Sequence, residues 1–433
     1  MKSFSVGFYT LGCKVSQYET EAISESFEAR GFTVRDFSDA NDVYVINTCT
    51  VTAEADRKSR QIIRRAKKRN PEAKVLVCGC YSQRSPDEVA RIPDVDATIG
   101  SAGKMQLVDI AERLLAGAGR ETCVTSIDDE PFETMKITKG PRTRVYVKIE
   151  DGCECRCTYC AIPSARGRVR SKPRSQVIEE VEALSQSGVR EIVLTGIETG
   201  SYGADFEEKY TLADLLSELD ARGSAERIRL GSLAPELVGK AFLEKVRNLK
   251  ILAPHFHISI QSGSDSVLRG MKRRYNRAMA LENIRNLKEA IPRATFTTDM
   301  MVGFPGESEE DFLESVRFVE EARFLDCHVF AYSKRKNTPA ALYEGQIPEA
   351  IKRERSERLI KVAERVRNEV LDGIVASGEA MPCIFEEKSD GVWKGHSDTF
   401  VTVEVESDGE LHGECRMVIP IARKDGSVLC KLV

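Results

Sequence analysis

Short apolar runs alternate with amphipathic helical stretches along most of the chain, and this alternation limits the fold more than any other feature. The first block contains the runs FSVGFYT, VYVINTC, KVLVCG and ATIG, with helical patterns over residues 17–30, 52–69 and 104–116. Strands that alternate with helices form parallel, doubly wound sheets. We therefore predict a doubly wound parallel α/β domain over residues 1–118. A segment rich in Pro, Gly and charges, residues 119–143, is predicted to be a linker.

The second block, residues 144–376, repeats the strand-and-helix pattern six times. Its strand-like runs are VYVKIE, EIVLTG, RIRLGS, FHISIQ, TFTTDM and CHVFAY. A complete eight-fold barrel takes about 250 residues, which is more than these six units occupy. We therefore predict a partial, open (β/α)6 barrel, closed by a long charged helix over about residues 348–376.

The third block, residues 377–433, changes to short strands. The runs MPCIFEEK, TFVTVEV, GECRMVIP and SVLCKLV are punctuated by Gly and Asp. This pattern is typical of a small antiparallel β-barrel.

The composition excludes some classes of function. A hydrophobic fraction of 41% with 30% charged residues is ordinary for a soluble protein, and the sequence pI near 6.0 gives no overall basic signature for nucleic acid. The sequence offers neither a secretory leader nor an apolar window long enough to span a membrane. We expect a cytoplasmic protein with reduced thiols, in which clustered cysteines indicate metal binding or catalysis.

Four cysteines crowd into the stretch CECRCTYC: Cys153, Cys155, Cys157 and Cys160. In the spacing C-x3-C-x2-C, three thiolates can hold three irons of a four-iron cluster and leave the fourth iron open to a ligand. A zinc site remains an alternative, although the second C-x2-C pair that zinc usually takes is missing. Cys155 could complete a four-cysteine electron-transfer cluster. In an extended loop, however, it would point away from its neighbours, so we predict that it is not a ligand.

The loops that follow the other barrel strands are rich in Gly, Ser and small polar residues. They read TGIETGSYG, GSLAPE, QSGSD and VGFPGE, and they would share the mouth of the barrel with the cysteine loop. Glycine permits a close backbone approach to a ligand. Candidate ligand contacts around this mouth are Gly196, Glu198, Ser232, Gln261 and Asp299.

A second set of cysteines lies in the first block. Cys13, Cys49 and Cys80 each follow a predicted strand of the doubly wound sheet, and ligands bind in the crevice beyond the carboxyl ends of such strands. Free cysteines are often small buried hydrophobes, and that alternative stands for each one singly. Three at equivalent positions favour a second metal site. The other cysteines are predicted to be structural: Cys78, Cys123, Cys327, Cys383, Cys415 and Cys430.

These motifs carry a family resemblance over essentially the whole chain. TLGCKVSQYETE, NTCTVT and GCYSQR resemble the N-terminal domain of the methylthiotransferases of the radical S-adenosylmethionine (SAM) class. DGCECRCTYCAIPSARGRVRSKP, HFHISIQSGSDSVLRGM and DMMVGFPGESEEDF resemble their catalytic barrel, and the last block resembles their TRAM domain. Tyr159 stands where this class has an aromatic residue near the adenine of SAM.

The resemblance implies two four-iron, four-sulfur clusters and SAM as cofactors. Cys153, Cys157 and Cys160 would hold the cluster that generates a 5′-deoxyadenosyl radical from SAM. Cys13, Cys49 and Cys80 would hold the cluster that delivers sulfur. One cofactor molecule would supply the methyl group and another the radical, so that the difficult chemistry stays on the cofactors. A flavodoxin or ferredoxin would be the reductant, and a monomer is expected.

The family has three known branches, and the substrate follows from the branch. They modify isopentenyladenosine in tRNA, threonylcarbamoyladenosine in tRNA, or an aspartate of a ribosomal protein. TLGCKVSQYETE, LTGIETGSYG and RGRVRSKP look most like the second branch. The expected product is a methylthio group on carbon 2 of threonylcarbamoyladenosine at tRNA position 37. The other two substrates are alternatives, and a non-catalytic, metal-stabilised RNA-binding module is a third.

Two features depart from the family pattern. Glu154 stands where an Asn is usual, with the extra Cys155 after it, which would change the charge near the cluster. The last block carries 6 Lys and Arg against 11 Asp and Glu, an unsuitable charge for RNA, although Trp393, His396 and Phe400 could stack on bases. We therefore predict that this domain makes few RNA contacts or contributes mainly shape.

Basic runs elsewhere are better candidates for an RNA contact. The target base would lie in a single-stranded anticodon loop, which an enclosed site can reach. The runs RQIIRRAKKR and MKRRY are basic, but ARGRVRSKPR lies directly beside the cysteine loop. Its cations are the predicted phosphate contacts: Arg166, Arg168, Arg170, Lys172 and Arg174.

Overall fold

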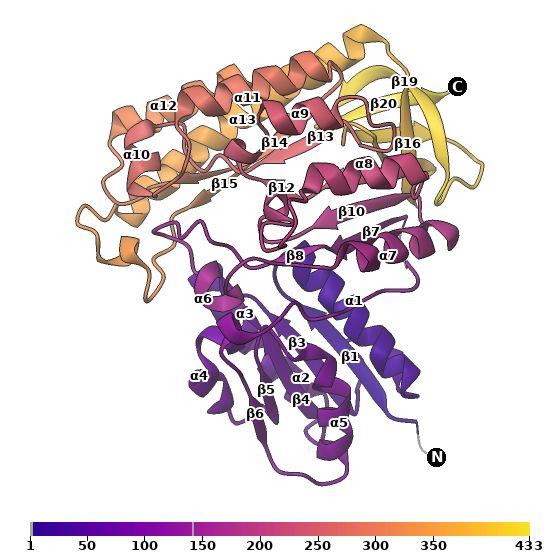
Figure 1. Cartoon of the computed structure of the whole chain (residues 1–433), viewed down its shortest axis with the longest axis vertical. Coiled ribbons are helices and arrows are strands. Elements are labelled where there is room, and N and C mark those ends of the chain that lie inside the picture. The colour runs from indigo at the N-terminus through magenta and orange to yellow at the C-terminus, as the bar shows by residue number, and fades with distance from the viewer. Residues whose placement is uncertain (1–2, 141–142) are drawn as a thin grey trace.

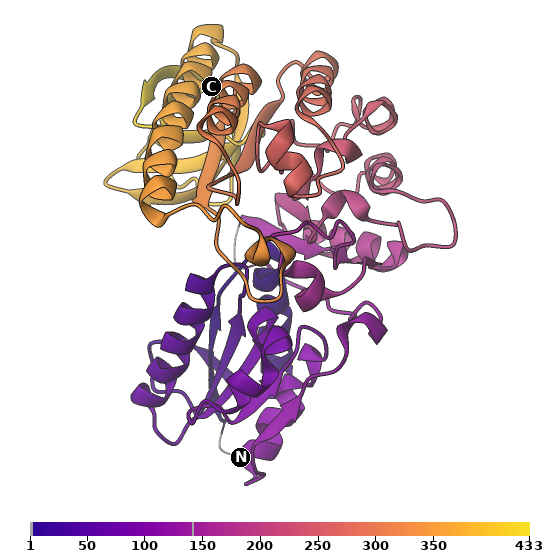
Figure 2. The same cartoon turned by 90° about the vertical axis from the view of Figure 1, so that its left-hand side faces the viewer.

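The computed structural model describes residues 3–140 and 143–433, which form three units (Figures 1 and 2). The first is an α/β domain, drawn in indigo and purple in Figure 1. The second is a parallel partial barrel in magenta and orange, and the third is a small yellow β-barrel at the C-terminus. Among the described residues, no helix has both the length and the apolar character needed to cross a membrane.

The N-terminal sheet has six parallel strands in the order β2-β1-β3-β4-β5-β6. Helices α1 and α5 cover one face through Ile23, Phe27 and Leu107, and helices α2 and α4 cover the other through Ile62, Ile63 and Val89. The predicted doubly wound topology is thereby confirmed. The elements are β1 (Ser5–Thr10), α1 (Lys14–Ala29), β2 (Thr33–Arg35), β3 (Val43–Thr48), α2 (Ala53–Arg69), β4 (Lys74–Gly79), α3 (Cys80–Arg84), α4 (Pro86–Ala90), β5 (Ala97–Ile99), α5 (Leu107–Leu115) and β6 (Glu121–Cys123).

Part of the predicted linker is structured. Strand β6 lies inside residues 119–143 and pairs in parallel with β5, so the sheet continues beyond residue 118. Further along, Met135 and Ile137 are buried in the core of the second unit. This segment therefore packs against both units, and the division of the chain into domains stays a prediction.

Six strand positions form an open arc in the second unit. The sheets β11-β10-β7 and β12-β13-β14-β15 are both parallel, and only Gly231 separates β11 from β12. The predicted partial (β/α)6 barrel is confirmed. The strands are β7 (Arg144–Lys148), β10 (Glu191–Thr195), β11 (Arg227–Leu230), β12 (Ser232–Leu233), β13 (His255–Ile258), β14 (Thr295–Val302) and β15 (Asp326–Ala331).

Helices surround this arc on its outer side (Figure 1). They are α7 (Arg174–Gln186), α8 (Leu212–Arg222), α9 (Lys240–Val246), α10 (Asp265–Gly270), α11 (Arg277–Ala290), α12 (Glu309–Ala322) and α13 (Glu349–Ser377). A short ladder, β8 (Glu150–Asp151) with β9 (Arg170–Ser171), and the short helix α6 (Ile162–Arg166) lie after β7.

Helix α1 joins the first unit to the barrel. Its Tyr18 and Ala22 belong to the same buried cluster as Val145 and Val147 of β7. Tyr18 also donates its hydroxyl to the Met135 carbonyl at 2.6 Å. Because α1 begins directly after Cys13, this contact places the N-terminal cysteines beside the barrel.

The C-terminal unit is a closed five-stranded barrel in the order β16-β17-β18-β20-β19. Its strands are β16 (Met381–Ser389), β17 (Val392–Ser397), β18 (Thr402–Glu406), β19 (Cys415–Lys424) and β20 (Ser427–Leu432). Strand β17, VWKGHS, was not among the four predicted strands, because its Lys, Gly and His break the apolar pattern.

A turn of this small barrel covers the amino end of the partial barrel. Phe400 stacks on His255 of β13 with ring centroids 4.6 Å apart, and the guanidinium groups of Arg144 and Arg229 lie over its ring. Arg229 also donates to the backbone carbonyls of residues 397 and 398. The Phe400 ring is therefore already occupied by contacts with the partial barrel.

Two further aromatic side chains that could stack on RNA bases make contacts within the protein, and the expectation that this domain makes few RNA contacts stays a prediction. His396 packs on Phe400 at 5.1 Å. Trp393 is buried and donates its indole N–H to the Gly409 carbonyl at 2.9 Å. All three rings are thus occupied within the protein.

Candidate active site between two cysteine clusters

The first cluster of cysteines lies in a loop at the carboxyl end of β7, directly after β8. Three sulfurs in it accept hydrogen bonds. The backbone N–H groups of Cys155 and Ile162 donate to the Sγ atoms of Cys153 and Cys160 at 3.5 and 3.4 Å. Arg273 donates to Cys157 Sγ at 3.2 Å. Such donors stabilise thiolates, which are the form that binds metal.

Cys155 lies closer to the cluster than predicted. Arg156 has a φ of 49°, in the left-handed region, so the loop turns instead of running extended. Cys155 shares a side-chain hydrogen bond with Cys153, which raises the pKa of Cys153 and lowers that of Cys155. The geometric reason for setting Cys155 aside is therefore wrong, whereas its exclusion as a ligand stays a prediction.

The second cluster of cysteines forms at the carboxyl ends of β1, β3 and β4. Cys13 is the N-cap of α1, Cys49 follows β3, and Cys80 begins α3. Gly12 has a φ of 124°, and a Cβ atom there would lie 3.0 Å from Ser16 Oγ and 3.3 Å from Cys49 Cβ, so glycine permits the close approach. Burial and the neighbouring Cys80 raise the pKa of Cys49 to about 12.

The donor sets suit iron–sulfur clusters, which take cysteine thiolates as ligands. All thirteen cysteines are free thiols. Within residues 3–140 and 143–433, however, no three Cys, His, Asp or Glu side chains already stand at metal-binding distances. A four-iron cluster does not need such an arrangement, because each of its three thiolates binds a different iron.

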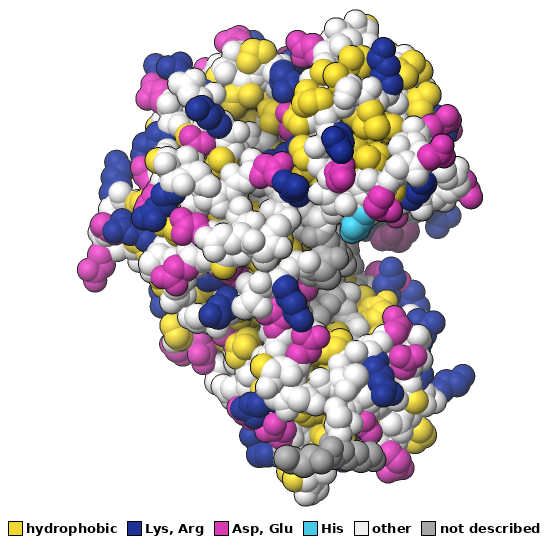
Figure 3. All heavy atoms as spheres, turned by 90° about the vertical axis from the view of Figure 1, so that its right-hand side faces the viewer, with side chains coloured by type: hydrophobic (Ala, Val, Ile, Leu, Met, Phe, Trp, Pro, Cys, Tyr) yellow, Lys and Arg dark blue, Asp and Glu magenta, His cyan; other side chains and the backbone are white. Residues whose placement is uncertain are grey.

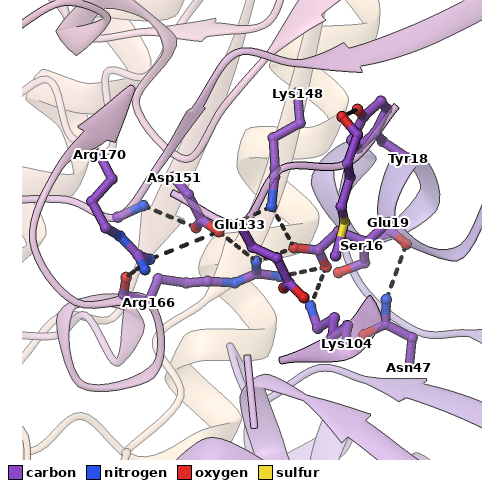
Figure 4. A network of polar contacts seen from close by, with 12 residues as sticks. Ser16, Tyr18, Glu19, Asn47, Lys104, Glu133, Lys148, Asp151, Arg166 and Arg170 are labelled. Carbon is purple, nitrogen blue, oxygen red and sulfur yellow. Dashed lines mark hydrogen bonds and ion pairs between the residues drawn. The ribbon is translucent and has the colours of Figure 1, made fainter. Parts of the chain in front are cut away.

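Arg166 connects the two clusters of cysteines. It ends α6, six residues beyond Cys160, and its side chain is fully buried against the first domain. Its Nε donates to Cys80 Sγ at 3.2 Å, and its Nη1 donates to Glu19 of α1 at 2.5 Å and to Asp151 at 3.1 Å. Figure 4 shows Arg166, Glu19 and Asp151 converging from both units.

Glu19 is the centre of this buried network. Besides Arg166 it pairs with Lys104 of the first unit and with Lys148 of β7, the latter at 3.0 Å. Burial alone would raise the pKa of Glu19, but Arg166, Lys104 and Lys148 outweigh burial and hold the pKa well below its usual range. A carboxylate therefore persists at the interface and links residues of both units.

Three of the five predicted phosphate contacts are buried in this region. Arg166 pairs with Glu19, Arg170 donates to the Arg166 carbonyl at 2.7 Å, and Lys172 pairs with Glu180. Their side chains cannot reach a phosphate, so the structure contradicts the prediction for these three. Arg168 and Arg174 are exposed, and for them it stays a prediction.

Two buried carboxyl groups line the barrel beyond β7 and β10. Glu198 accepts the Ala234 N–H at 3.0 Å, and burial raises its pKa to about 8. Glu150 accepts the Glu198 N–H at 2.9 Å, while its Oε1 has no partner among the described residues. A Cβ atom on Gly196 would lie 2.4 Å from Glu150 Oε2, so only glycine fits there.

The remaining predicted contacts differ in their setting. Ser232 and Ser259 share a hydroxyl hydrogen bond, and Gln261 has a φ of 68° where its backbone bridges to β14. Asp299 lies within β14, not in a loop, and pairs with His257 at 3.3 Å and His328 at 3.2 Å. Tyr159 packs, half-buried, in the apolar cluster around Phe304.

Sequence reasoning missed two arginines at the site. Arg273, from the basic run MKRRY, contacts Cys157 and lies over the Tyr275 ring at 4.9 Å. Arg84 donates to Ser164 Oγ at 2.9 Å and to the Lys336 carbonyl at 2.6 Å. Burial and the neighbouring Arg335 lower the pKa of Arg84. Arg84 ends the helix that begins at Cys80 and contacts Ser164, four residues beyond Cys160, so it lies between the two clusters of cysteines.

Comparisons with known proteins agree with this architecture. Residues 147–319 match the Radical SAM superfamily, and residues 5–100 match a family described as uncharacterized protein family UPF0004. Among solved structures, the radical S-adenosylmethionine methyltransferase TsrM from Kitasatospora setae, with cobalamin and a [4Fe-4S] cluster bound, covers 91% of this chain and 81% of its own. Its TM-score is 0.57 at 14% identity, a likeness of fold alone.

Curated relatives are much more similar in sequence. The threonylcarbamoyladenosine tRNA methylthiotransferase MtaB of Bacillus subtilis is 40% identical over 95% of this chain and 92% of its own. The Thermotoga maritima protein of the same name is 36% identical over 99% and 97%. A tRNA-2-methylthio-N(6)-dimethylallyladenosine synthase of Acetivibrio thermocellus is 30% identical over 94% and 86%.

The barrel with its cysteine loop defines an enzyme of the radical SAM class, which uses SAM and a 4Fe-4S cluster. Within that class, the chain belongs to the methylthiotransferase family.

Proposed function

We propose that this enzyme adds a methylthio group to carbon 2 of threonylcarbamoyladenosine at position 37 of tRNA. The observation that carries the proposal is the identity of 36–40% to threonylcarbamoyladenosine tRNA methylthiotransferases over at least 95% of this chain. The site supports it, because Arg166, from the helix that follows one set of cysteines, donates to Cys80 of the other set. One set can serve radical generation and the other sulfur delivery.

The residues divide into two roles under this proposal. Cys153, Cys157 and Cys160 would hold one four-iron cluster with an open iron for SAM. Cys13, Cys49 and Cys80 would hold a second, whose open iron would carry the sulfur to be transferred. When bound, the first cluster and SAM supply the carbon radical that an unreactive C–H bond requires.

The protein's own side chains would orient these groups. Arg273 and Arg166 each donate to one sulfur of a different set, at 3.2 Å in both cases. Glu198, with a pKa of about 8, would be mostly protonated at neutral pH and able to donate a hydrogen bond to a ligand at the mouth.

A flavodoxin- or ferredoxin-type reductant and a monomeric state belong to the same proposal. The second candidate substrate is dimethylallyladenosine (isopentenyladenosine) in tRNA. A tRNA-2-methylthio-N(6)-dimethylallyladenosine synthase, which makes the methylthio derivative of that nucleoside, is 30% identical over 94% of this chain. The two substrates differ in charge, since only the threonylcarbamoyl group carries a carboxylate.

The test is anaerobic turnover with two tRNA substrates, followed by mass spectrometry of the nucleosides. We expect the methylthio product from tRNA that carries threonylcarbamoyladenosine, and little or none from tRNA that carries isopentenyladenosine. Product only from tRNA with isopentenyladenosine would favour the second candidate substrate. Absence of product from both tRNAs would refute both candidate functions.

Cysteine variants test the division of roles. Reconstituted protein should hold about eight irons per chain, from two four-iron clusters. The triple variant Cys13→Ala, Cys49→Ala, Cys80→Ala should keep about four irons and still cleave SAM reductively, but form no methylthio product. If it loses all iron, or if SAM cleavage stops, the two sets are not separate sites.

A further inference from the structure

Helix α2 carries an unusual concentration of positive charge. Eight of its seventeen residues are Lys or Arg, and its two acidic residues, Glu54 and Asp56, both lie in the first turn. The acidic residues suit the positive end of the helix dipole, and the basic ones continue to its end. A run of charged residues is commonly no more than a solvated helix face. We therefore ask which of these cations already have a partner within the protein and which are free to bind a ligand.

Half of these cations have local partners. Arg57 pairs with Glu54, Arg60 with Glu88 at 3.2 Å and Lys67 with Asp96 at 3.0 Å, and Arg69 lies over the Phe37 ring at 5.0 Å. The other four are exposed, and in the described part of the chain none of them has a carboxylate oxygen within 4.0 Å. These four, the α2 basic stripe, are Lys58, Arg64, Arg65 and Lys68.

The helical period places the stripe on one side of α2. Lys58, Arg65 and Lys68 fall, with Gln61, at positions three or four residues apart, and Arg64 lies four residues before Lys68; each of these positions is exposed. At a rise of 1.5 Å per residue, the ten steps from Lys58 to Lys68 span about 15 Å. A row of this length can face two or three successive phosphates of one nucleic-acid strand.

The orientation of α2 links the stripe to the active site. The helix begins four residues after Cys49 and is held there by the barrel, since Arg335 donates to Asp56 at 2.6 Å and Ser333 Oγ accepts the Ala53 N–H at 3.2 Å. The stripe therefore starts near the cysteines and runs away from them.

Two other candidate surfaces are less suited to an anion. The C-terminal barrel is acidic, and the basic run beside the cysteine loop is mostly buried. On the face shown in Figure 3, basic and acidic side chains are interspersed. Charge complementarity thus favours a polyanion over α2.

We propose that the α2 basic stripe binds the phosphate backbone of the substrate tRNA beside the modified nucleotide. This inference rests on the proposed function and names a contact surface for it. Such contacts contribute affinity without reading sequence, and each one makes binding weaker as salt rises.

The test combines Arg64→Gln, Arg65→Gln and Lys68→Gln in the full-length enzyme. Loss of three phosphate contacts should reduce the slope of log Kd against log salt by about 2 and raise Kd for tRNA at low salt at least about tenfold. KM for tRNA should rise, while kcat at saturating tRNA and the iron content stay unchanged. Arg64→Lys with Arg65→Lys should retain the wild-type slope, because a phosphate contact depends on the charge.

The matched control removes three exposed cations, also without carboxylates in reach, from the outer helices α11 and α13: Arg285→Gln, Lys288→Gln and Lys361→Gln. It should leave the slope unchanged. An unchanged slope in the α2 variant, or an equal loss in the control, would overturn the inference.

An acidic reductant protein is the competing occupant of the stripe. The α2 variant should be equally impaired when a small chemical reductant replaces a flavodoxin, because the defect lies in tRNA binding. A defect seen only with the protein reductant would reassign the surface and overturn the inference. Wild-type protein that binds but does not modify tRNA would refute the proposed function instead, and leave the salt-slope test valid.

Discussion

At the scale of single residues, Glu19 illustrates how one carboxylate can define an interface. It is fully buried and accepts hydrogen bonds from three cations, of which Arg166 and Lys148 come from the barrel. Buried ion pairs are poor sources of net stability, yet removing one partner is costly because the others remain charged and unsolvated. The contribution of Glu19 to stability is therefore best measured by removing its charge and leaving the three cations in place.

Glu19→Gln should destabilise the protein by about 3–5 kcal/mol, because it leaves Arg166, Lys104 and Lys148 without their shared anion. Thermal or denaturant unfolding would measure the change. The matched control is Glu28→Gln on the same helix, whose pair with Lys139 is exposed, and it should cost less than about 1 kcal/mol. Similar losses for the two variants would contradict this account of Glu19.

Cys155 provides the second prediction at this scale. Cys155→Ala should retain the iron of the barrel cluster and reductive SAM cleavage, because three other cysteines suffice for three irons. Cys157→Ala should abolish both. Iron analysis and the yield of 5′-deoxyadenosine after reduction would measure them. Loss of the cluster in Cys155→Ala would make the Cys155 thiolate a ligand, which its contact with Cys153 permits.

At the scale of elements, the turn at residues 397–400 decides how the C-terminal barrel is attached. Phe400 has a φ of 66°, a costly conformation for an aromatic residue, and it is held between His255 and His396. Thr295 of β14 also donates its hydroxyl to the Thr399 carbonyl. The turn thus fits the amino end of the partial barrel through stacking, cation–π contacts and hydrogen bonds.

Phe400→Ala should cost about 2–3 kcal/mol through lost packing and cation–π contacts. Limited proteolysis should then cut more readily between α13 and β16 and release the small barrel. Phe400→Leu keeps most of the volume and should cost about 1 kcal/mol, so the difference isolates the aromatic contribution. Proteolysis at the wild-type rate in Phe400→Ala would show that this contact does not hold the barrel.

Sequence reasoning predicted the elements well where local periodicity determines them. The alternation of strand and helix identified both parallel sheets, and the positions of cysteines after strands located both clusters. It could not identify β6, three residues long, or β17, whose apolar pattern is broken. It also could not predict that Arg166, Arg170 and Lys172 are buried, because their partners, such as Glu19 for Arg166 and Glu180 for Lys172, belong to other elements.

At the scale of the whole molecule, buried carboxylates hold the three units together. Glu19 and Asp151 lie between the first unit and the barrel. Glu191 of β10 pairs with Arg144, Arg227 and Arg229, and the two latter reach the C-terminal barrel. Burial alone would raise the pKa of Glu191, but these arginines outweigh burial and lower it.

Acid should therefore weaken the assembly. A carboxylate whose pKa is lower in the folded state stabilises that state above its unfolded pKa, near 4, and the contribution is lost as the pH falls below that value. The free energy of unfolding should decline progressively from about pH 5 towards pH 2. Denaturant unfolding at a series of pH values would measure it, and a constant free energy over this range would contradict the depressed pKa values.

The burial of Trp393 has a practical consequence. It is the only tryptophan of the chain, and it lies inside the C-terminal barrel. Intrinsic fluorescence excited at the indole band will therefore follow that barrel alone, whereas circular dichroism averages over all three units. Comparing the two signals would reveal whether the small barrel melts with the rest of the molecule or before it, without any attached label.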